Sequence, residues 1–359
     1  MFKGLTMRII SSKTVVIAIL TIYCFVGYAC KDTRTGPSIP QRDVQWKIYT
    51  ETNSKLVDNV INVIYIDGAD VKWFGTNDGA CRFGYGNWET YKKELEFDGI
   101  GGKSRKVNAI TVGLDDRVWI GLAGGGIRRI VRGSPELMAT IKSPVLKSDM
   151  VYTLFRDRGG YIWVGTAKGV CRCIPDQLDP DLDRWTQYTS ESSPLPDEPI
   201  RTIATNPLDN VLWFGTYTQG LISYNNDLDW TINSPLEIPF PVTSISFTFW
   251  NFCWVGTYAD WAYQFDVNTT EWKQYGTSSD SGLPDFIVNA TVFDPAGIAW
   301  FGTNKGITKF DGSKWKTWNS SNSQLPSNTV KSLAVDKRGN LWIGTSSGVA
   351  EFNEGGILN

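Results

Sequence analysis

Histidine, the side chain that enzymes use most often for acid–base chemistry near neutral pH, is absent from this 359-residue sequence. Its absence excludes serine-histidine-aspartate and cysteine-histidine nucleophiles, and most zinc sites. Lys and Arg together number 35 against 37 for Asp and Glu. This balance does not favour nucleic acid as a partner, because phosphates require a clearly basic face. The hydrophobic fraction of 42% is sufficient for a folded core.

Aspartates are the strongest remaining candidates for catalysis. Four of them, Asp58, Asp149, Asp197 and Asp285, lie two or three residues before a predicted first strand of a repeat. A pair of carboxylates can act on a polysaccharide as general acid and base. Aspartate also forms turns beside strands, which is the simpler interpretation. We therefore predict no catalytic residues, and a polysaccharide lyase or hydrolase remains an alternative function.

The cysteines do not have the pattern of a metal site. Cys81, Cys171, Cys173 and Cys253 lie in the body of the chain, without a Cys-x-x-Cys pair and without histidine. Cys171 and Cys173 stand two apart in an apparent strand, so they share a face and cannot easily bond to each other. We predict four buried thiols, no metal and no cofactor.

The start of the chain is typical of an export signal. Basic side chains precede an apolar stretch over residues 15–26, which is too short to span a membrane comfortably. A small residue directly before Cys30 resembles a bacterial lipoprotein cleavage site. We predict a lipoprotein-type signal peptide over 1–29, lipidation of Cys30 and a polar tether over 30–43. The protein would then lie in the cell envelope, in the periplasm or at the outer membrane, and contact the membrane only through its lipid. An ordinary secreted protein and an uncleaved anchor are the alternatives.

A motif centred on tryptophan recurs seven times and indicates how the chain is organised. Each copy has Trp, an apolar residue and Gly, usually followed by Thr. The copies begin at Trp73, Trp119, Trp163, Trp213, Trp254, Trp300 and Trp342. Spacings of 41 to 50 residues match one four-stranded propeller blade per copy. The 16 Trp and 35 Gly residues likewise suit a repetitive all-β protein.

Each repeat predicts a first strand, a tight turn, a second strand with the Trp motif, a third strand and a short fourth strand. The seventh repeat ends without a fourth strand, and Trp46-Lys-Ile-Tyr near the start of the chain matches the missing segment. We predict an all-β, seven-bladed β-propeller over 44–359, with this N-terminal strand completing blade seven and closing the ring. We expect a monomer.

These repeats resemble the two-component regulator propeller repeat, whose core is Trp-Ile-Gly-Thr followed by a Gly-containing turn and a short apolar strand. The resemblance covers residues 44–353. In that family the repeats commonly form the periplasmic sensor half of hybrid histidine kinases, often ones that detect glycan fragments. Because this sequence has no histidine and no kinase-sized region, the resemblance implies a stand-alone sensor or binding propeller without the signalling chemistry.

The second position of each predicted first strand always holds a side chain that can form hydrogen bonds. In chain order these residues are Asn62, Asn108, Tyr152, Arg201, Thr243, Asn289 and Lys331. The first strand of a propeller blade lines the central channel, so we predict a polar ring near one channel mouth that binds a ligand. The alternative is that a water-filled channel simply tolerates polar side chains.

Blade five contains two tryptophans without a role in the repeat, Trp250 and Trp261. Trp261 stands where blade four has Gly220, and we predict that it forms an aromatic ligand platform with Tyr217 and Tyr258. The polar residues expected beside this platform are Asp260, Arg201, Asn289 and Lys305. The alternative is that Trp261 covers the core at the seam of blades five and six. Trp250 is a lesser candidate for a protein contact on the opposite face.

The leading functional hypothesis is a non-catalytic, exported and lipid-anchored propeller that binds a carbohydrate or a protein partner in the cell envelope. A structural or assembly module of an envelope complex is a further alternative to the polysaccharide-acting enzyme. The fold does not distinguish among these functions, so the residues at the channel mouth must.

Overall fold

The computed structural model describes residues 45–92, 95, 105–131, 137–176, 179–225, 229–233, 241–248, 250–276 and 282–357. The predicted signal peptide, Cys30 and the tether lie outside these ranges. Within the described ranges, no helix is both long enough and apolar enough to cross a membrane.

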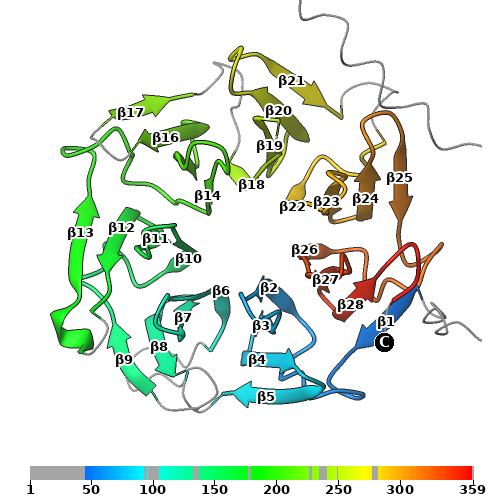
Figure 1. The fold of residues 1–359 in the computed structure, drawn as a ribbon, viewed down its shortest axis with the longest axis horizontal. Coiled ribbons are helices and arrows are strands. Elements are labelled where there is room, and N and C mark those ends of the chain that lie inside the picture. Colours follow the sequence, from blue (N-terminus) through cyan, green and yellow to red (C-terminus); the bar gives the residue numbers. More distant parts are fainter. Residues whose placement is uncertain are drawn as a thin grey trace, which may run out of the picture. The chain divides into compact units, whose positions relative to one another are not determined.

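Seven antiparallel sheets of four strands each stand around a central channel, which confirms the predicted seven-bladed β-propeller (Figure 1). Blade one consists of β2 (Ile61–Ile66), β3 (Lys72–Thr76), β4 (Gly79–Gly84) and β5 (Asn87–Tyr91). Blade two consists of β6 (Val107–Val112), β7 (Arg117–Leu122), β8 (Gly126–Val131) and β9 (Leu137–Ile141). Blade three consists of β10 (Val151–Arg156), β11 (Ile162–Thr166), β12 (Gly169–Ile174) and β13 (Arg184–Tyr188). Blade four consists of β14 (Thr202–Thr205), β15 (Leu212–Gly215), β16 (Leu221–Asn225) and β17 (Asp229–Ile232). Blade five consists of β18 (Val242–Phe247), β19 (Phe252–Thr257), β20 (Ala262–Asp266) and β21 (Trp272–Tyr275). Blade six consists of β22 (Val288–Phe293), β23 (Ala299–Thr303), β24 (Gly306–Phe310) and β25 (Trp315–Trp318). A short 3-10 helix, η2 (Pro180–Leu182), precedes β13.

Blade seven takes its outer strand from the other end of the chain. It consists of β26 (Val330–Val335), β27 (Leu341–Thr345), β28 (Gly348–Phe352) and β1 (Trp46–Tyr49). In the antiparallel pair of β1 and β28, Trp46 lies opposite Phe352, and their ring centroids are 4.2 Å apart. The predicted ring closure is therefore confirmed, and β1 covers the edge of β28 that would otherwise be unpaired.

The tryptophan of the motif and the preceding turn form one hydrogen-bonded unit. In four blades the buried indole N–H donates to an aspartate carboxylate six residues earlier. These pairs are Trp73 with Asp67 at 3.1 Å, Trp163 with Asp157 at 2.8 Å, Trp300 with Asp294 at 3.2 Å, and Trp342 with Asp336 at 3.0 Å. The other oxygen of Asp157 accepts the main-chain N–H of Tyr161 at 2.9 Å. One carboxylate thus holds the turn and satisfies a buried donor.

The glycine of the motif allows adjacent blades to approach closely. A Cβ atom on Gly75 would lie 2.5 Å from Cγ1 of Val107, the first residue of the first strand in blade two. The same contact continues across the closure, where a Cβ on Gly344 would lie 2.7 Å from Cγ2 of Ile61. The aliphatic first position and the motif glycine are therefore two sides of one inter-blade contact.

The four described cysteines are free and buried, as predicted. Burial raises the pKa of the Cys81 thiol to about 12 and that of Cys171 to about 11. Such thiols remain protonated at neutral pH and act as small apolar groups. In the part of the chain that the structure describes, no group of acidic residues and cysteines is arranged to hold a metal ion.

Candidate functional site

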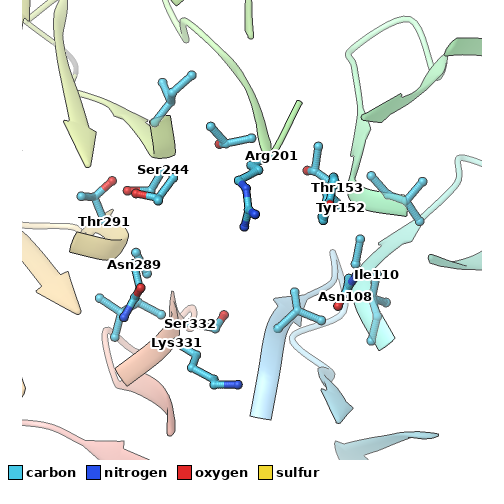
Figure 2. Close-up of a pocket in the computed structure, with 18 residues that line it drawn as sticks. Asn108, Ile110, Tyr152, Thr153, Arg201, Ser244, Asn289, Thr291, Lys331 and Ser332 are labelled. Carbon is cyan, nitrogen blue, oxygen red and sulfur yellow. The ribbon is translucent and has the colours of Figure 1, made fainter. Parts of the chain in front are cut away.

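One mouth of the central channel is a cavity of about 300 Å³ to which all seven blades contribute. The residues that line it are Asn62, Asn108, Tyr152, Arg201, Thr243, Tyr258, Asn289 and Lys331. Seven of these are the predicted polar ring, and the eighth, Tyr258, belongs to the predicted aromatic platform. Below this mouth the channel continues past Ser244, Thr291 and Ser332 as a second cavity of about 230 Å³ (Figure 2). The structure thus brings the ring together, and its binding of a ligand stays a prediction.

Three members of the ring connect their own blade to the next one. The side-chain amide of Asn108 donates to the carbonyl of Val151 at 2.9 Å, and that of Asn289 donates to the carbonyl of Val330 at 2.8 Å. The hydroxyl of Thr243 donates to the main chain of blade six in the same way. A polar residue at this position therefore has a structural role in addition to any role in binding.

Two cations of the ring extend into the cavity instead. The guanidinium carbon of Arg201 lies 4.9 Å from the ring centroid of Tyr152, and Figure 2 shows Arg201 and Lys331 projecting from different sides into the central space. The ammonium of Lys331 donates to Oδ1 of Asn62 at 3.1 Å. None of the eight lining residues carries a carboxylate, so the mouth is positively charged.

The ammonium of Lys331 is partly removed from water. Burial and the positive charge of Lys106 lower the pKa of Lys331, and the charge of Asp58 acts in the opposite direction. The charged form of this side chain is therefore held at a cost, which a bound anion would offset.

The two tyrosines of the predicted platform occupy different surroundings. Tyr258 and Tyr217 are both exposed, at 55% and 45%, but only Tyr258 lines the cavity. The main-chain N–H of Tyr217 donates to a carboxylate oxygen of Glu198 at 2.9 Å. The two residues follow the motif threonine in adjacent blades, so they form a matched pair for testing the cavity.

Trp261 adopts the backbone conformation of the glycine that it replaces. Its φ angle is 63°, against 67° for Gly220. In both turns the carbonyl of this residue accepts the hydroxyl of the motif threonine, Thr216 at 3.1 Å and Thr257 at 3.0 Å. The alignment of Trp261 with Gly220 is therefore confirmed. A side chain at positive φ is strained, so packing must hold it there.

The indole of Trp261 packs over the core between blades five and six. A Cβ on Gly276 would lie 2.3 Å from the indole ring, and the ring of Phe286 meets the indole edge-on with centroids 6.4 Å apart. The indole also packs against the cluster that contains Trp254 and Phe301. Our premise that a turn offers little surface to cover a tryptophan is wrong, because the end of β21 and the linker at Phe286 supply that surface. These contacts match the alternative in which Trp261 covers the core.

The four polar residues predicted near the platform also occupy different surroundings. Arg201 and Asn289 line the cavity, whereas Asp260 and Lys305 do not. Asp260 accepts hydrogen bonds from the hydroxyl of Tyr263 and, at 2.9 Å, from the side-chain amide of Gln274. Its carboxylate thus belongs to the sheet of blade five.

The four aspartates considered for catalysis do not line the cavity. Asp58 and Asp285 each accept the main-chain N–H two residues later, at 2.6 and 3.3 Å. Asp149 accepts the main-chain N–H of Ser143 at 2.7 Å, and Asp197 forms an ion pair with a lysine. The turn interpretation accounts for the first three, and the ion pair accounts for Asp197.

Sequence reasoning missed a charged cavity at the closure of the ring. This cavity of about 510 Å³ is lined by residues of blades seven and one that include Tyr49, Lys72, Trp342 and Glu351. The third-strand residue opposite the motif tryptophan is a cation in four blades, namely Arg82, Arg129, Arg172 and Lys309, but is Glu351 in blade seven. The acidic residue at this position of blade seven is the feature of the sequence that could have indicated the cavity. Lys72 of blade one supplies the cation there, 5.4 Å from the Trp342 ring centroid.

The opposite end of the channel is larger and more apolar. It forms a cavity of about 690 Å³ lined in part by Pro207, Phe247, Phe293 and Pro295. Trp250 is 66% exposed, and its ring edge lies beside Gly297. Trp250 is thus accessible, as a protein contact would require, and that role stays a prediction.

The sequence matches a family model for the two-component regulator propeller at residues 145–168 and 324–347. The first segment contains β10 and β11, and the second contains β26 and β27. Both therefore cover the first two strands of a blade. None of the curated proteins compared with the sequence matches it significantly.

Solved structures share the fold at low sequence identity. The extracellular domain of BT4673 from B. thetaiotaomicron, described both as a one-component and as a hybrid two-component system, has a TM-score of 0.67 at 18% identity, over 87% of this chain and 40% of that chain. PorZ, a surface component of the type-IX secretion system of Porphyromonas gingivalis, gives 0.64 at 15%, over 82% and 46%. A catalytically inactive histidine-to-alanine variant of virginiamycin B lyase from Staphylococcus aureus, crystallised with quinupristin, gives 0.65 at 14%, over 86% and 98%.

These neighbours establish the architecture alone, and this chain spans less than half the length of the BT4673 and PorZ chains. The family match falls on the repeats from which the resemblance was inferred. The chain is therefore a seven-bladed propeller in which two repeats, those of blades three and seven, match the two-component regulator propeller model.

Proposed function

We propose that this protein is an exported, lipid-anchored and non-catalytic propeller that binds a carbohydrate or protein partner in the cell envelope. The observation that carries the proposal is the channel mouth, where eight polar or aromatic side chains from seven blades converge on one cavity. Such a site has the concave shape and the few fixed polar groups typical of ligand sites.

The composition of the cavity supports binding without catalysis. Hydrolysis of a polysaccharide requires two carboxyl groups near the scissile bond, and none lines this mouth. The virginiamycin B lyase neighbour is inactive as a histidine-to-alanine variant, and this sequence contains no histidine. A lyase mechanism of that kind therefore has no equivalent residue here.

Export and anchoring rest on the start of the sequence. Structural neighbours that are described as an extracellular domain and a bacterial surface component are consistent with export. Radiolabelled palmitate should enter the wild-type protein but not the Cys30→Ser variant. Equal labelling of both, or labelling of neither, would show that Cys30 carries no lipid.

The matched tyrosines test the binding site. A glycan array and immobilised envelope proteins would first identify what the wild-type protein retains. Tyr258→Ala should then weaken that interaction by about 1–3 kcal/mol, the range for an aromatic residue at a binding centre. Tyr217→Ala, an equally exposed tyrosine outside the cavity, serves as the control and should leave affinity unchanged. Equal losses in both variants, or no loss in either, would contradict binding at the channel mouth.

A further inference from the structure

The charge of the channel mouth defines its ligand more closely than its shape does, provided that the mouth binds a ligand as the proposed function requires. Blades four and seven each contribute a cation, Arg201 and Lys331, and the other six lining residues are uncharged. Figure 2 shows both cationic groups reaching into the same central space. Two cations without a lining carboxylate repel each other, and this arrangement is stabilised when an anion lies between them.

Arg201 is poised for a planar anion. Among the described residues, its guanidinium makes no hydrogen bond and no ion pair, and it contacts the face of Tyr152. A guanidinium that stacks on an aromatic face keeps the N–H groups at its edge available. Those donors match the two oxygens of a carboxylate.

Lys331 can hold the same anion from the other side of the mouth. Its ammonium is positioned by Asn62 at 3.1 Å, which leaves further N–H donors, since an ammonium has three. No carboxylate forms a salt bridge with Lys331 in the described part of the chain, although Asp58 and Lys106 both influence it electrostatically. An anion bound here would gain a partly desolvated, positioned cation.

The rest of the mouth offers what a saccharide needs. Asn108 and Asn289 use their NH₂ groups for bonds between blades, so their amide oxygens are the groups that can accept hydrogen bonds from a ligand. Sugar hydroxyls are suitable donors. Tyr258 presents an exposed aromatic ring at the rim. A cavity of about 300 Å³ is at the small end of ligand pockets, so it suits one or two sugar rings better than a folded protein surface.

We propose that the channel mouth binds an acidic saccharide, with the carboxylate of a uronic acid residue held between Arg201 and Lys331. The hydroxyls of the sugar donate to the amide oxygens of the ring, and its apolar face packs on Tyr258. A neutral glycan would leave both cations without a partner and would bind more weakly.

Isothermal titration calorimetry on the propeller with oligomers of galacturonate, mannuronate and glucuronate tests this proposal. At least one of the three should bind, and its methyl-esterified form, which has lost the charge, should bind at least tenfold more weakly. Arg201→Gln and Lys331→Gln should each weaken the acidic oligomer at least tenfold. Lys305→Gln removes a cation that does not line the cavity and should bind normally. Thermal melting checks that each variant is folded.

The outcomes separate the two levels of the proposal. If ester and acid bind equally, and Tyr258→Ala weakens both, the mouth is a glycan site but its selectivity for an anion is refuted. If oligoglutamate binds and none of the uronate oligomers does, the ligand is an acidic peptide and the saccharide is refuted. If neither saccharide nor peptide binds, and the array and envelope proteins also yield no ligand, the proposed function itself is overturned.

Discussion

The contact between the motif glycine and the next blade leads to a prediction that can be tested by a double-mutant cycle. A Cβ on Gly302 would lie 2.6 Å from Cγ1 of Val330 and 3.3 Å from its Cβ. Leu333 is the next nearest side chain, at 3.5 Å. Gly302→Ala therefore creates one severe overlap, and that overlap is with a single residue.

The expected coupling energy follows from two opposing effects of Gly302→Ala and from the effect of Val330→Ala. Overpacking a core costs about 1–3 kcal/mol, and replacing glycine with alanine returns about 0.4–1 kcal/mol through the unfolded chain. Val330 is fully buried, so Val330→Ala loses the burial of two carbons, about 1.6 kcal/mol, in addition to a cavity penalty. In the double variant the new methyl group of residue 302 occupies the space that Val330 has vacated. We expect the pair to be about 1–2 kcal/mol more stable than the sum of the single changes.

Urea unfolding followed by tryptophan fluorescence measures all four proteins. Gly68→Ala is the control, because a Cβ there meets nothing within 4 Å, and it should be neutral or slightly stabilising. Strictly additive effects at Gly302 and Val330 would refute the reasoning. So would a Gly302→Ala variant that is as stable as Gly68→Ala.

Three further predictions concern the closure and blade five. Deleting residues 44–52 removes β1, and we expect a loss of about 5 kcal/mol or more in the free energy of unfolding, whereas an unchanged cooperative melt would contradict closure by this strand. Burial raises the pKa of Glu351 above its ordinary 4.5, so the cost of burying this carboxylate is absent below pH 4.5 and grows as the pH rises through the folded pKa. Urea unfolding should therefore show that Glu351→Gln gains stability over wild type between pH 4 and 7. A stability difference that stays constant over this range would contradict the prediction. Trp261→Ala should lower the free energy of unfolding by about 3 kcal/mol, the low end of the range for a tryptophan because this one is partly buried, with binding at the mouth unchanged. A loss of affinity at unchanged stability would restore the aromatic platform.

The fold was predictable because its constraints repeat within one chain. The motif glycine and the aliphatic first position of the next blade recur at every seam, as in Gly75 with Val107 and Gly344 with Ile61. A contact repeated around the ring acts as an internal alignment. The closure was predictable for the same reason, since the segment starting at Trp46 matches the fourth strand of other blades.

Features that occur once were harder to predict. The environment of Trp261 depends on Gly276 and Phe286, which tertiary structure brings to it from the end of one blade and the linker to the next. Glu351, the acidic residue that stands where four other blades have a cation, also depends on residues from elsewhere in the chain. It is compatible with blade seven only through groups such as Tyr49, which donates to its carboxylate at 3.1 Å. A repeat pattern describes what blades share, and each of these residues is an exception to it.

The channel mouth combines residues that follow the repeat with residues that depart from it. This explains why the mouth was found from the sequence although its ligand was not. Asn108, Thr243 and Asn289 are short, and each bonds to the main chain of the next blade, so a polar residue recurs here for structural reasons. Arg201 and Lys331 are too long to repeat that short bond, and they reach into the cavity instead. A position that the architecture requires to be polar can exchange a connecting residue for a ligand-binding one without a change of fold. Specificity in such a ring is therefore expected among the four blades that depart from the connecting bond, which carry Asn62, Tyr152, Arg201 and Lys331.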